Sequence, residues 1–276
     1  MSIIAADGLA SRFDPQVLGY LAAMPPTDDD SSLCFLTTRN PSIDSFDRDH
    51  CIRQDPHRPN VLVIGDSHAD QFMGELRRTY PEIAFSQVTA SGCLMLLHDR
   101  GEARCVGLAD RLYGDWLKTY HFDAAILSAR WSSRSTSDPV ARTMAALRAD
   151  GIVPIVLGPS QEYAEDLPSL LAYGVVRGVD LAPRNERISG IRKADKRLTD
   201  DIGTPAGSYF SILALNCPVD HCRTLTPDGQ PMLHDSNHLS EAGARYVLDQ
   251  LRQQGLLADL VARTRNATLQ SLRVAG

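Results

Sequence analysis

Ser67 lies at a point in the chain where a serine can act as a nucleophile. Residues 61–64 are apolar and typical of a buried parallel strand, and Gly65 ends the run and allows a sharp turn. Ser67 then falls at or near a helix start, where backbone N–H groups lack partners. A serine there can attack a carbonyl and lend its own N–H to an oxyanion hole. Serines before helices are also common N-caps, so the motif alone leaves both roles open.

Asp235 and His238 are the second candidates for chemistry. They lie three residues apart, just before the last predicted helix, so the carboxylate can reach the imidazole and hold one tautomer. Such a pair also arises by chance. His234, four residues before His238, offers a third ligand for a metal, but no cluster of further ligands is evident. We therefore expect no metal and no cofactor.

The elements that position these residues alternate between strands and helices. Strands are predicted over residues 61–64, 83–89, 124–128, 152–157 and 209–215. Helices are predicted over residues 68–80, 105–120, 139–149, 167–178, 186–201 and 240–254. This alternation predicts an α/β fold with a parallel sheet covered on both faces. Ligands bind at the carboxyl ends of such strands, which is where Ser67 lies.

Composition narrows the classes of protein further. The 276 residues carry 28 basic and 34 acidic side chains, a net charge of −6, which argues against general nucleic-acid binding. No run of about 18 apolar residues is present, and the first residues lack the features of a signal peptide. We divide the chain into an irregular extension or linker at 1–55, a domain at 56–262 that carries the candidate catalytic residues and a tail at 263–276.

Taken together, the Gly-Asp-Ser block and the Asp-x-x-His block resemble those of the SGNH hydrolase superfamily. The resemblance implies a three-layer α/β/α sandwich, flavodoxin-like, with a parallel sheet of about five strands. It implies that Ser67 is the nucleophile, His238 the general base and Asp235 the acid that orients it. It also implies an oxyanion hole formed by Ser67 and Gly92, because Gly92 follows the second predicted strand.

A closer resemblance is to the SGNH domain at the C-terminus of acyltransferase-3 membrane proteins, over about residues 34–255. Residues 61–69, 91–93, 128–131 and 235–244 carry it. It implies an O-acyltransferase that acetylates a bacterial surface saccharide such as lipopolysaccharide O-antigen. It further implies a periplasmic location, an acyl donor, a saccharide acceptor and an acyltransferase-3 membrane domain in the same or a neighbouring chain. Residues 8–13 resemble the stretch that leads out of that membrane domain, as expected for an excised piece.

The third superfamily block departs from the pattern. Where an Asn is expected after the third strand, this sequence has Ala129, Arg130 and Trp131, so the third oxyanion donor is not identified. Arg130 can bind an anionic substrate group or pair with an acid such as Asp66. Trp131 can stack on a sugar or lie in the core. His68, beside Ser67, can pack or line the pocket.

Six cysteines fall in three close pairs along the chain. Alone, they fit metal or redox chemistry in a reducing compartment and disulfides in an oxidising one. Residues Cys217, His221 and Cys222 are a poor zinc set, because an adjacent His and Cys do not suit a tetrahedral site. The resemblance to an extracytoplasmic domain favours three local disulfides, which are Cys34–Cys51, Cys93–Cys105 and Cys217–Cys222.

Two alternative functions remain open at this point. A carbohydrate acetyl esterase uses the same three residues and differs only in passing the acyl group to water. A non-catalytic glycan-binding module would retain the fold but has no need for all three of Ser67, Asp235 and His238.

Overall fold

A six-stranded parallel sheet forms the centre of the computed structural model, which describes residues 13–264 except 27, 29–30, 99, 133–136, 203–204 and 219–220. The strand order is β1-β3-β2-β4-β5-β6. The strands are β1 (Phe35–Leu36), β2 (Asn60–Gly65), β3 (Ala84–Ala90), β4 (Ala124–Ser128), β5 (Val153–Leu157) and β6 (Tyr209–Phe210). The predicted parallel α/β sheet is confirmed, with β1 as an extra short edge strand.

Strand β2 shows why the sheet must be covered on both sides. All six of its residues are buried. Val61 and Val63 pack into one apolar cluster, and Leu62 and Ile64 pack into another on the opposite face. Successive side chains of a strand point to opposite faces, so an uninterrupted apolar run needs a helical layer on each side.

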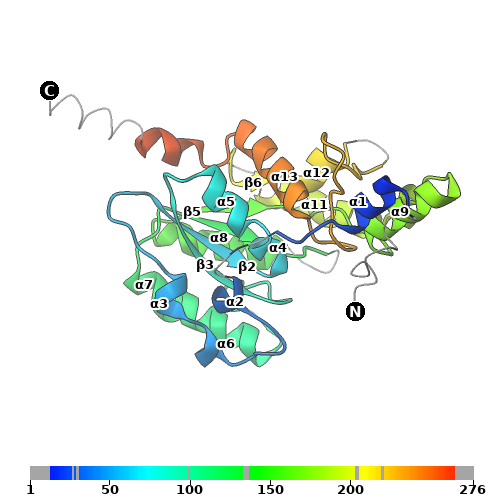
Figure 1. The fold of residues 1–276 in the computed structure, drawn as a ribbon. Coiled ribbons are helices and arrows are strands. Elements are labelled where there is room, and N and C mark those ends of the chain that lie inside the picture. Colours follow the sequence, from blue (N-terminus) through cyan, green and yellow to red (C-terminus); the bar gives the residue numbers. More distant parts are fainter. Residues whose placement is uncertain are drawn as a thin grey trace, which may run out of the picture.

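The helices supply those two layers, with α5 and α13 on one side of the sheet and α6 on the other (Figure 1). The first layer contains α4 (Ser67–Asp70), α5 (Met73–Thr79), α9 (Leu167–Arg177), α10 (Ala182–Asn185), α12 (Ile212–Asn216) and α13 (Glu241–Gln253). The second contains α6 (Ala103–Arg111), the π-helix η4 (Leu112–Trp116), α7 (Leu117–Thr119), α8 (Ser137–Ala149) and α11 (Ile188–Ile202). The fold is the expected three-layer α/β/α sandwich.

Three predicted elements differ from the structure. The helix expected over residues 105–120 is divided into α6, the π-helix η4 and α7. The helix expected over residues 68–80 is divided into α4 and α5, and the buried Gln71 at the break donates to the His68 carbonyl and accepts from the Leu239 N–H. The strand expected over residues 209–215 ends after two residues. Ser211 caps α12 instead, because its Oγ accepts the N–H of Ala214 at 2.9 Å.

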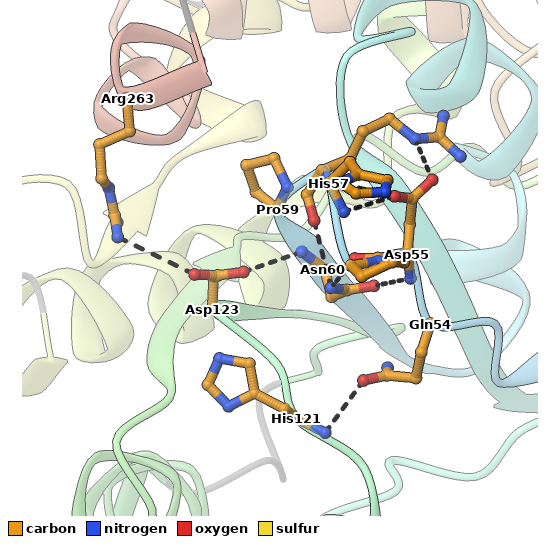
Figure 2. Close-up of a pocket in the computed structure, with 10 residues that line it drawn as sticks. Gln54, Asp55, His57, Pro59, Asn60, His121, Asp123 and Arg263 are labelled. Carbon is orange, nitrogen blue, oxygen red and sulfur yellow. Dashed lines mark hydrogen bonds and ion pairs between the residues drawn. The ribbon is translucent and has the colours of Figure 1, made fainter. Parts of the chain in front are cut away.

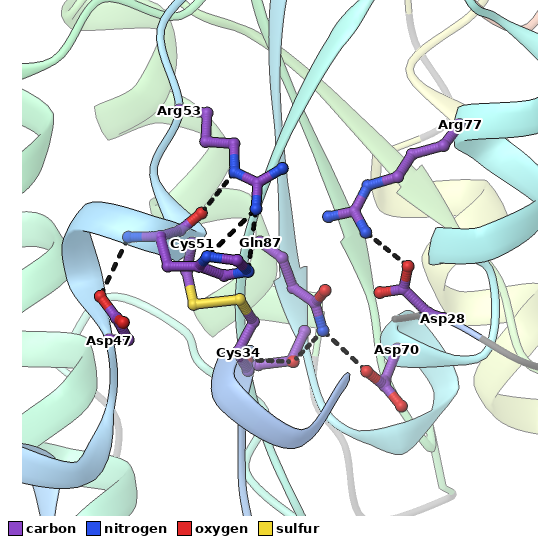
Figure 3. The surroundings of a disulfide bond; sticks show 10 residues. Asp28, Cys34, Asp47, Cys51, Arg53, Asp70, Arg77 and Gln87 are labelled. Carbon is purple, nitrogen blue, oxygen red and sulfur yellow. Dashed lines mark hydrogen bonds and ion pairs between the residues drawn. A yellow bond between two sulfur atoms is a disulfide. The ribbon is translucent and has the colours of Figure 1, made fainter. Parts of the chain in front are cut away.

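Part of the segment expected to be an extension builds the edge of the sheet. This segment contains three short elements, which are α2 (Ser31–Cys34), the 3₁₀ helix η3 (Ile43–Ser45) and α3 (Arg48–Cys51). Strand β1 directly follows α2 and pairs in parallel with β3. The Cys34–Cys51 disulfide closes this segment, and the Thr89 hydroxyl donates to the Cys34 carbonyl (Figure 3). Further upstream, α1 (Pro15–Leu21) packs on α9.

All three predicted disulfides are present. The disulfide interpretation of the six cysteines is therefore confirmed over metal binding. Among the described residues, none of the helices has the length and apolar character needed to cross a membrane. Residues 1–12 and 265–276 lie outside the described part, so the expectations for residues 8–13 and for nearly all of the tail at 263–276 stay predictions.

Candidate active site

The turn after β2, residues 65–67, places Ser67 at the carboxyl edge of the sheet; we call it the nucleophile turn. Gly65 has φ +148°, and a Cβ at this position would lie 1.7 Å from the Ser128 carbonyl oxygen. No other residue fits this close approach between β2 and β4. The chain therefore turns sharply enough for Ser67 to begin α4, where its own N–H faces outward from the helix start.

The Asp66 side chain holds the nucleophile turn by accepting two backbone hydrogen bonds. Its Oδ1 accepts the His68 N–H at 2.8 Å, and its Oδ2 accepts the Arg130 N–H at 2.9 Å. The carboxyl is 2% exposed, and burial raises its pKa to about 6 although both hydrogen bonds oppose that shift. Asp66 thus joins the helix that begins at Ser67 to the loop after β4.

Ser67, His238 and Asp235 form one hydrogen-bonded chain. Ser67 Oγ lies 2.7 Å from His238 Nε2, and His238 Nδ1 lies 2.7 Å from Asp235 Oδ2. Asp235 Oδ1 accepts the backbone N–H groups of Asn237 at 2.8 Å and His238 at 2.7 Å. The structure therefore brings together the three residues that the two sequence motifs single out.

The electrostatics of these residues suit proton transfer from Ser67 to His238. Partial burial works to raise the pKa of Asp235, but the hydrogen bonds from His238 and from two backbone N–H groups outweigh it and hold the pKa well below its usual range. Asp235 stays ionised, so it accepts the Nδ1–H of His238. Nε2 is then free to take the Ser67 proton, which is the arrangement of a serine nucleophile with its base.

His68 packs against the ring of His238 in the interior of the domain. It is 3% exposed, its ring centroid lies 4.9 Å from that of His238, and its Nε2 lies 3.2 Å from Asn237 Oδ1. Burial, reinforced by the charge of His238, lowers the pKa of His68 to about 3. The neutral imidazole of His68 thus links the residue after Ser67 to Asn237, the residue before His238.

The loop after β3, residues 91–93, lies beside the nucleophile turn; we call it the oxyanion loop. Gly65 pairs with Thr89, so the two segments leave the sheet together. The N–H groups on either side of Gly92 are used, Ser91 to the Leu36 carbonyl and Cys93 to the Ala90 carbonyl. Gly92 itself is exposed and has φ +67°. Its N–H and that of Ser67 are the candidate oxyanion donors.

Arg130 and Trp131, the two candidate substrate-binding residues after β4, lie in different surroundings. Trp131 is 1% exposed, and its Nε1 donates to the Leu157 carbonyl at 2.8 Å, so it belongs to the core. The guanidinium of Arg130 is half exposed and binds both carboxylate oxygens of Glu162, at 2.9 and 2.7 Å. Its acid partner is therefore Glu162, whereas Asp66 binds only its backbone.

The metal alternatives do not fit the hydrogen bonds of the site. His234, Asp235 and His238 offer ligand atoms within 4.8 Å of one another. However, both ring nitrogens of His238 and Oδ2 of Asp235 are occupied within the chain that includes Ser67. A metal at this place would have to break that chain. Cys217 and Cys222 are joined to each other, which removes the zinc set with His221.

A separate cavity of about 520 Å³ lies at the opposite edge of the sheet (Figure 2). Asn60, at the start of β2, donates its N–H to Asp123 just before β4, and His121 and Arg263 also line the cavity. The amino ends of parallel strands face away from the carboxyl ends, so this cavity is distinct from the site around Ser67.

Sequence patterns give the Gly-Asp-Ser motif that contains Asp66, but they do not show that its carboxyl accepts the N–H groups of His68 and Arg130. They also do not reveal several further residues that support the site. Glu162, Gln71 and Asn237 act through contacts between distant segments, such as the 2.8 Å bond from the Leu239 N–H to Gln71.

The three-layer fold with Ser67, His238 and Asp235 at one edge of its sheet defines the class of SGNH hydrolase-like domains, which comprises esterases and acyltransferases. The model of the SGNH domain that is fused to AT3 domains matches residues 34–253, and the chain belongs to that family.

Two solved structures match this chain, and the first is similar in fold. The periplasmic domain of a lipopolysaccharide acetyltransferase from Salmonella ser. Paratyphi A has a TM-score of 0.66 and 16% identity, over 91% of this chain and 98% of that one. A carbohydrate acetylesterase family member from Sinorhizobium meliloti has a TM-score of 0.42 and 13% identity, over 72% of this chain and 99% of that one. None of the curated proteins matches this sequence.

Proposed function

We propose that this domain is an O-acyltransferase that moves an acyl group, most simply acetyl, to a hydroxyl of a bacterial surface saccharide through an acyl-Ser67 intermediate. The observation that carries the proposal is the unbroken chain from Ser67 Oγ through His238 to Asp235, with both links at 2.7 Å. Membership of a family of SGNH domains fused to AT3 domains supports transfer, because an AT3 membrane domain is a fitting source of the acyl group.

The first half of the reaction forms the acyl enzyme. His238 Nε2 takes the proton from Ser67 Oγ as this oxygen bonds to the carbonyl carbon of the donor. The N–H groups of Ser67 and Gly92 bind the oxyanion that develops. The bond between the carbonyl carbon and the donor's leaving atom then breaks, and His238 returns the proton to the leaving group.

The second half transfers the acyl group to the acceptor. A saccharide hydroxyl loses its proton to His238 Nε2 while its oxygen bonds to the acyl carbon. The bond to Ser67 Oγ breaks, and Ser67 recovers the proton. Asp235 stabilises the imidazolium in both halves, which its depressed pKa allows. The half-exposed guanidinium of Arg130 is placed to meet an anionic group of the acceptor if the Glu162 contact opens.

The location that this function requires is extracytoplasmic. Three disulfides are typical of proteins that mature in an oxidising compartment, as the periplasm is. We place the domain at the periplasmic face of the inner membrane, next to an AT3 domain in the same or a neighbouring chain.

Acetyl transfer to Ser67 is the direct test. Incubation with p-nitrophenyl acetate should add the mass of one acetyl group to the intact protein, and Ser67→Ala should add none. We expect Ser67→Ala to lose about 10⁴-fold or more in the rate of p-nitrophenol release, because loss of a triad member usually costs that much. A rate within about tenfold of the wild type would overturn the proposal.

Acceptor choice separates transfer from hydrolysis. Lipopolysaccharide or its released O-polysaccharide is added to the acetylated enzyme, and the products are analysed by mass. Acetylated saccharide supports the transferase, whereas free acetate as the sole product, with acceptor present, identifies an acetyl esterase. Absence of Ser67 labelling by a fluorophosphonate would instead favour a glycan-binding module.

A further inference from the structure

The oxyanion loop rests on a buried charge that the mechanism above does not use. Arg104, in the first turns of α6, is 5% exposed. One of its nitrogens, Nη1, donates to the Ser91 carbonyl at 2.6 Å and lies 2.9 Å from Sγ of Cys93. The next residue, Cys105, is joined to Cys93 by a disulfide.

A gain in the free energy of folding does not explain why Arg104 is buried here. Burying a guanidinium costs free energy unless it is well paired. The carboxylate partner of Arg104 is Glu102, at 3.0 Å, and the Glu102 side chain is 66% exposed, so water screens the pair. In addition, Nε of Arg104 is buried without a hydrogen-bond partner in the described structure. The neutral carbonyl of Ser91 is the contact that fixes the buried end.

The peptide that Arg104 holds is the one that carries the Gly92 N–H. The Ser91 carbonyl and the Gly92 amide belong to one planar trans unit, so the C=O and N–H bonds point in opposite directions. A donor bound to the carbonyl therefore fixes the direction of the N–H. A cationic donor also polarises the peptide and makes its N–H a stronger donor to negative charge.

We propose that Arg104 is a positioning residue for the oxyanion hole, which clamps the Ser91–Gly92 peptide so that the Gly92 N–H meets the oxyanion formed at Ser67. This inference rests on the acyl-serine mechanism proposed above. Arg104 touches no reacting atom, and its effect passes through the peptide.

Three variants test the clamp. Arg104→Met removes the donor and the charge, and Arg104→Lys keeps the charge and one donor but loses the planar fork. Arg111→Gln is the matched control, because Arg111 lies exposed on the same helix. Rates of p-nitrophenyl acetate turnover are divided by the number of Ser67 residues that a fluorophosphonate labels at completion, so that unfolded molecules do not count.

For Arg104→Met we expect kcat per labelled serine to fall about 10- to 100-fold with KM within about twofold, because the clamp acts on a contact made in the transition state. Binding of a boronic acid that mimics the oxyanion should weaken by a similar factor. Arg104→Lys should recover part of both losses, and Arg111→Gln should match the wild type.

Other outcomes overturn the inference. One is an Arg104→Met protein whose kcat per labelled serine equals that of Arg111→Gln. Another is an equal loss in Arg104→Lys and Arg104→Met with unchanged boronic acid binding, which means a role in packing alone. Should Arg104→Met fail to fold, the Arg104→Lys comparison decides. The Ser67→Ala result stands apart, since an active Ser67→Ala removes the acyl-serine mechanism itself.

Discussion

The nucleophile turn and the oxyanion loop follow neighbouring strands of one sheet, yet they are held by different means. Residues of the turn itself hold the nucleophile turn, with Gly65 allowing the bend and Asp66 capping α4. Side chains from α6 hold the oxyanion loop, namely Arg104 and, through its disulfide to Cys93, Cys105. The difference teaches that a nucleophile can be built from one short motif, whereas an oxyanion donor in this fold depends on the layer beneath it.

The largest effect on stability is expected at the nucleophile turn. Gly65→Ala places a Cβ 1.7 Å from the Ser128 oxygen at φ +148°, and backbone on both sides cannot move apart without breaking the pairing of β2 and β4. We expect the free energy of unfolding to fall by about 3–5 kcal/mol, measured by denaturant titration.

Gly151→Ala is the matched control for that measurement. Gly151 also has positive φ, at +77°, but a Cβ there meets nothing within 4 Å. We expect a loss of about 1 kcal/mol from the backbone conformation alone. Equal losses in the two variants would show that the close contact at Gly65 is unimportant.

The oxyanion loop is expected to respond to loss of the disulfide that joins it to α6. Replacing both Cys93 and Cys105 by Ser opens a 12-residue link and should lower the free energy of unfolding by about 2–4 kcal/mol. Because the link anchors the loop, we also expect kcat for p-nitrophenyl acetate to fall about tenfold. The control replaces both Cys217 and Cys222 by Ser and should leave kcat unchanged. A kcat that is the same in both double variants would argue against the dependence of the oxyanion loop on the Cys93–Cys105 disulfide.

The Asp70 carboxylate links α4, which begins at the nucleophile turn, to β3, which leads into the oxyanion loop. Its replacement is expected to have the smallest effect on the free energy of unfolding. Asp70 on α4 accepts Gln87 Nε2 from β3 at 2.7 Å, near the ion pair of Asp28 with Arg77 (Figure 3). Burial, aided by the charge of Asp28, raises its pKa to about 6, above the unfolded value of 3.8. Its contribution to stability is therefore present below about pH 4 and is lost as pH rises through about 6.

Asp70→Asn keeps the acceptor for Gln87 and removes the titration. We expect the variant to gain about 1–3 kcal/mol over the wild type at pH 8 and to match it at pH 4, as measured by denaturant titration at both values. A gain of the same size at both values would show that Asp70 does not titrate in this range.

Local patterns were sufficient for the strands β2 to β5 and for the pairing of Asp235 with His238, because these depend on apolar runs and on residues that are neighbours along the chain. Ser67 lies 171 residues from His238, and their juxtaposition was expected from the resemblance of the two motifs to the SGNH hydrolase superfamily. Strand β1 has two residues, too few for any periodic signal, and β6 is cut short because the Ser211 side chain caps a helix.

Contacts between distant segments escape such patterns. Arg130 pairs with Glu162, which lies 32 residues further along the chain. Asp66, the acid named as an example of a partner from the sequence, binds only the backbone N–H of Arg130. The hold of Arg104 on Ser91 depends on how α6 packs under β3, which no spacing in the sequence encodes. The sequence favours the core over a sugar-stacking platform for Trp131, but only the structure shows the contact that holds it there, in which the Leu157 carbonyl accepts its Nε1–H.

Both outer strands of the sheet, β1 and β6, are only two residues long. An outer strand exposes unpaired amide and carbonyl groups that can recruit a strand from another molecule, and the risk grows with its length. Here a second chain finds little to pair with at either side. Copies of the domain can therefore crowd together on a surface without joining into a continuous sheet.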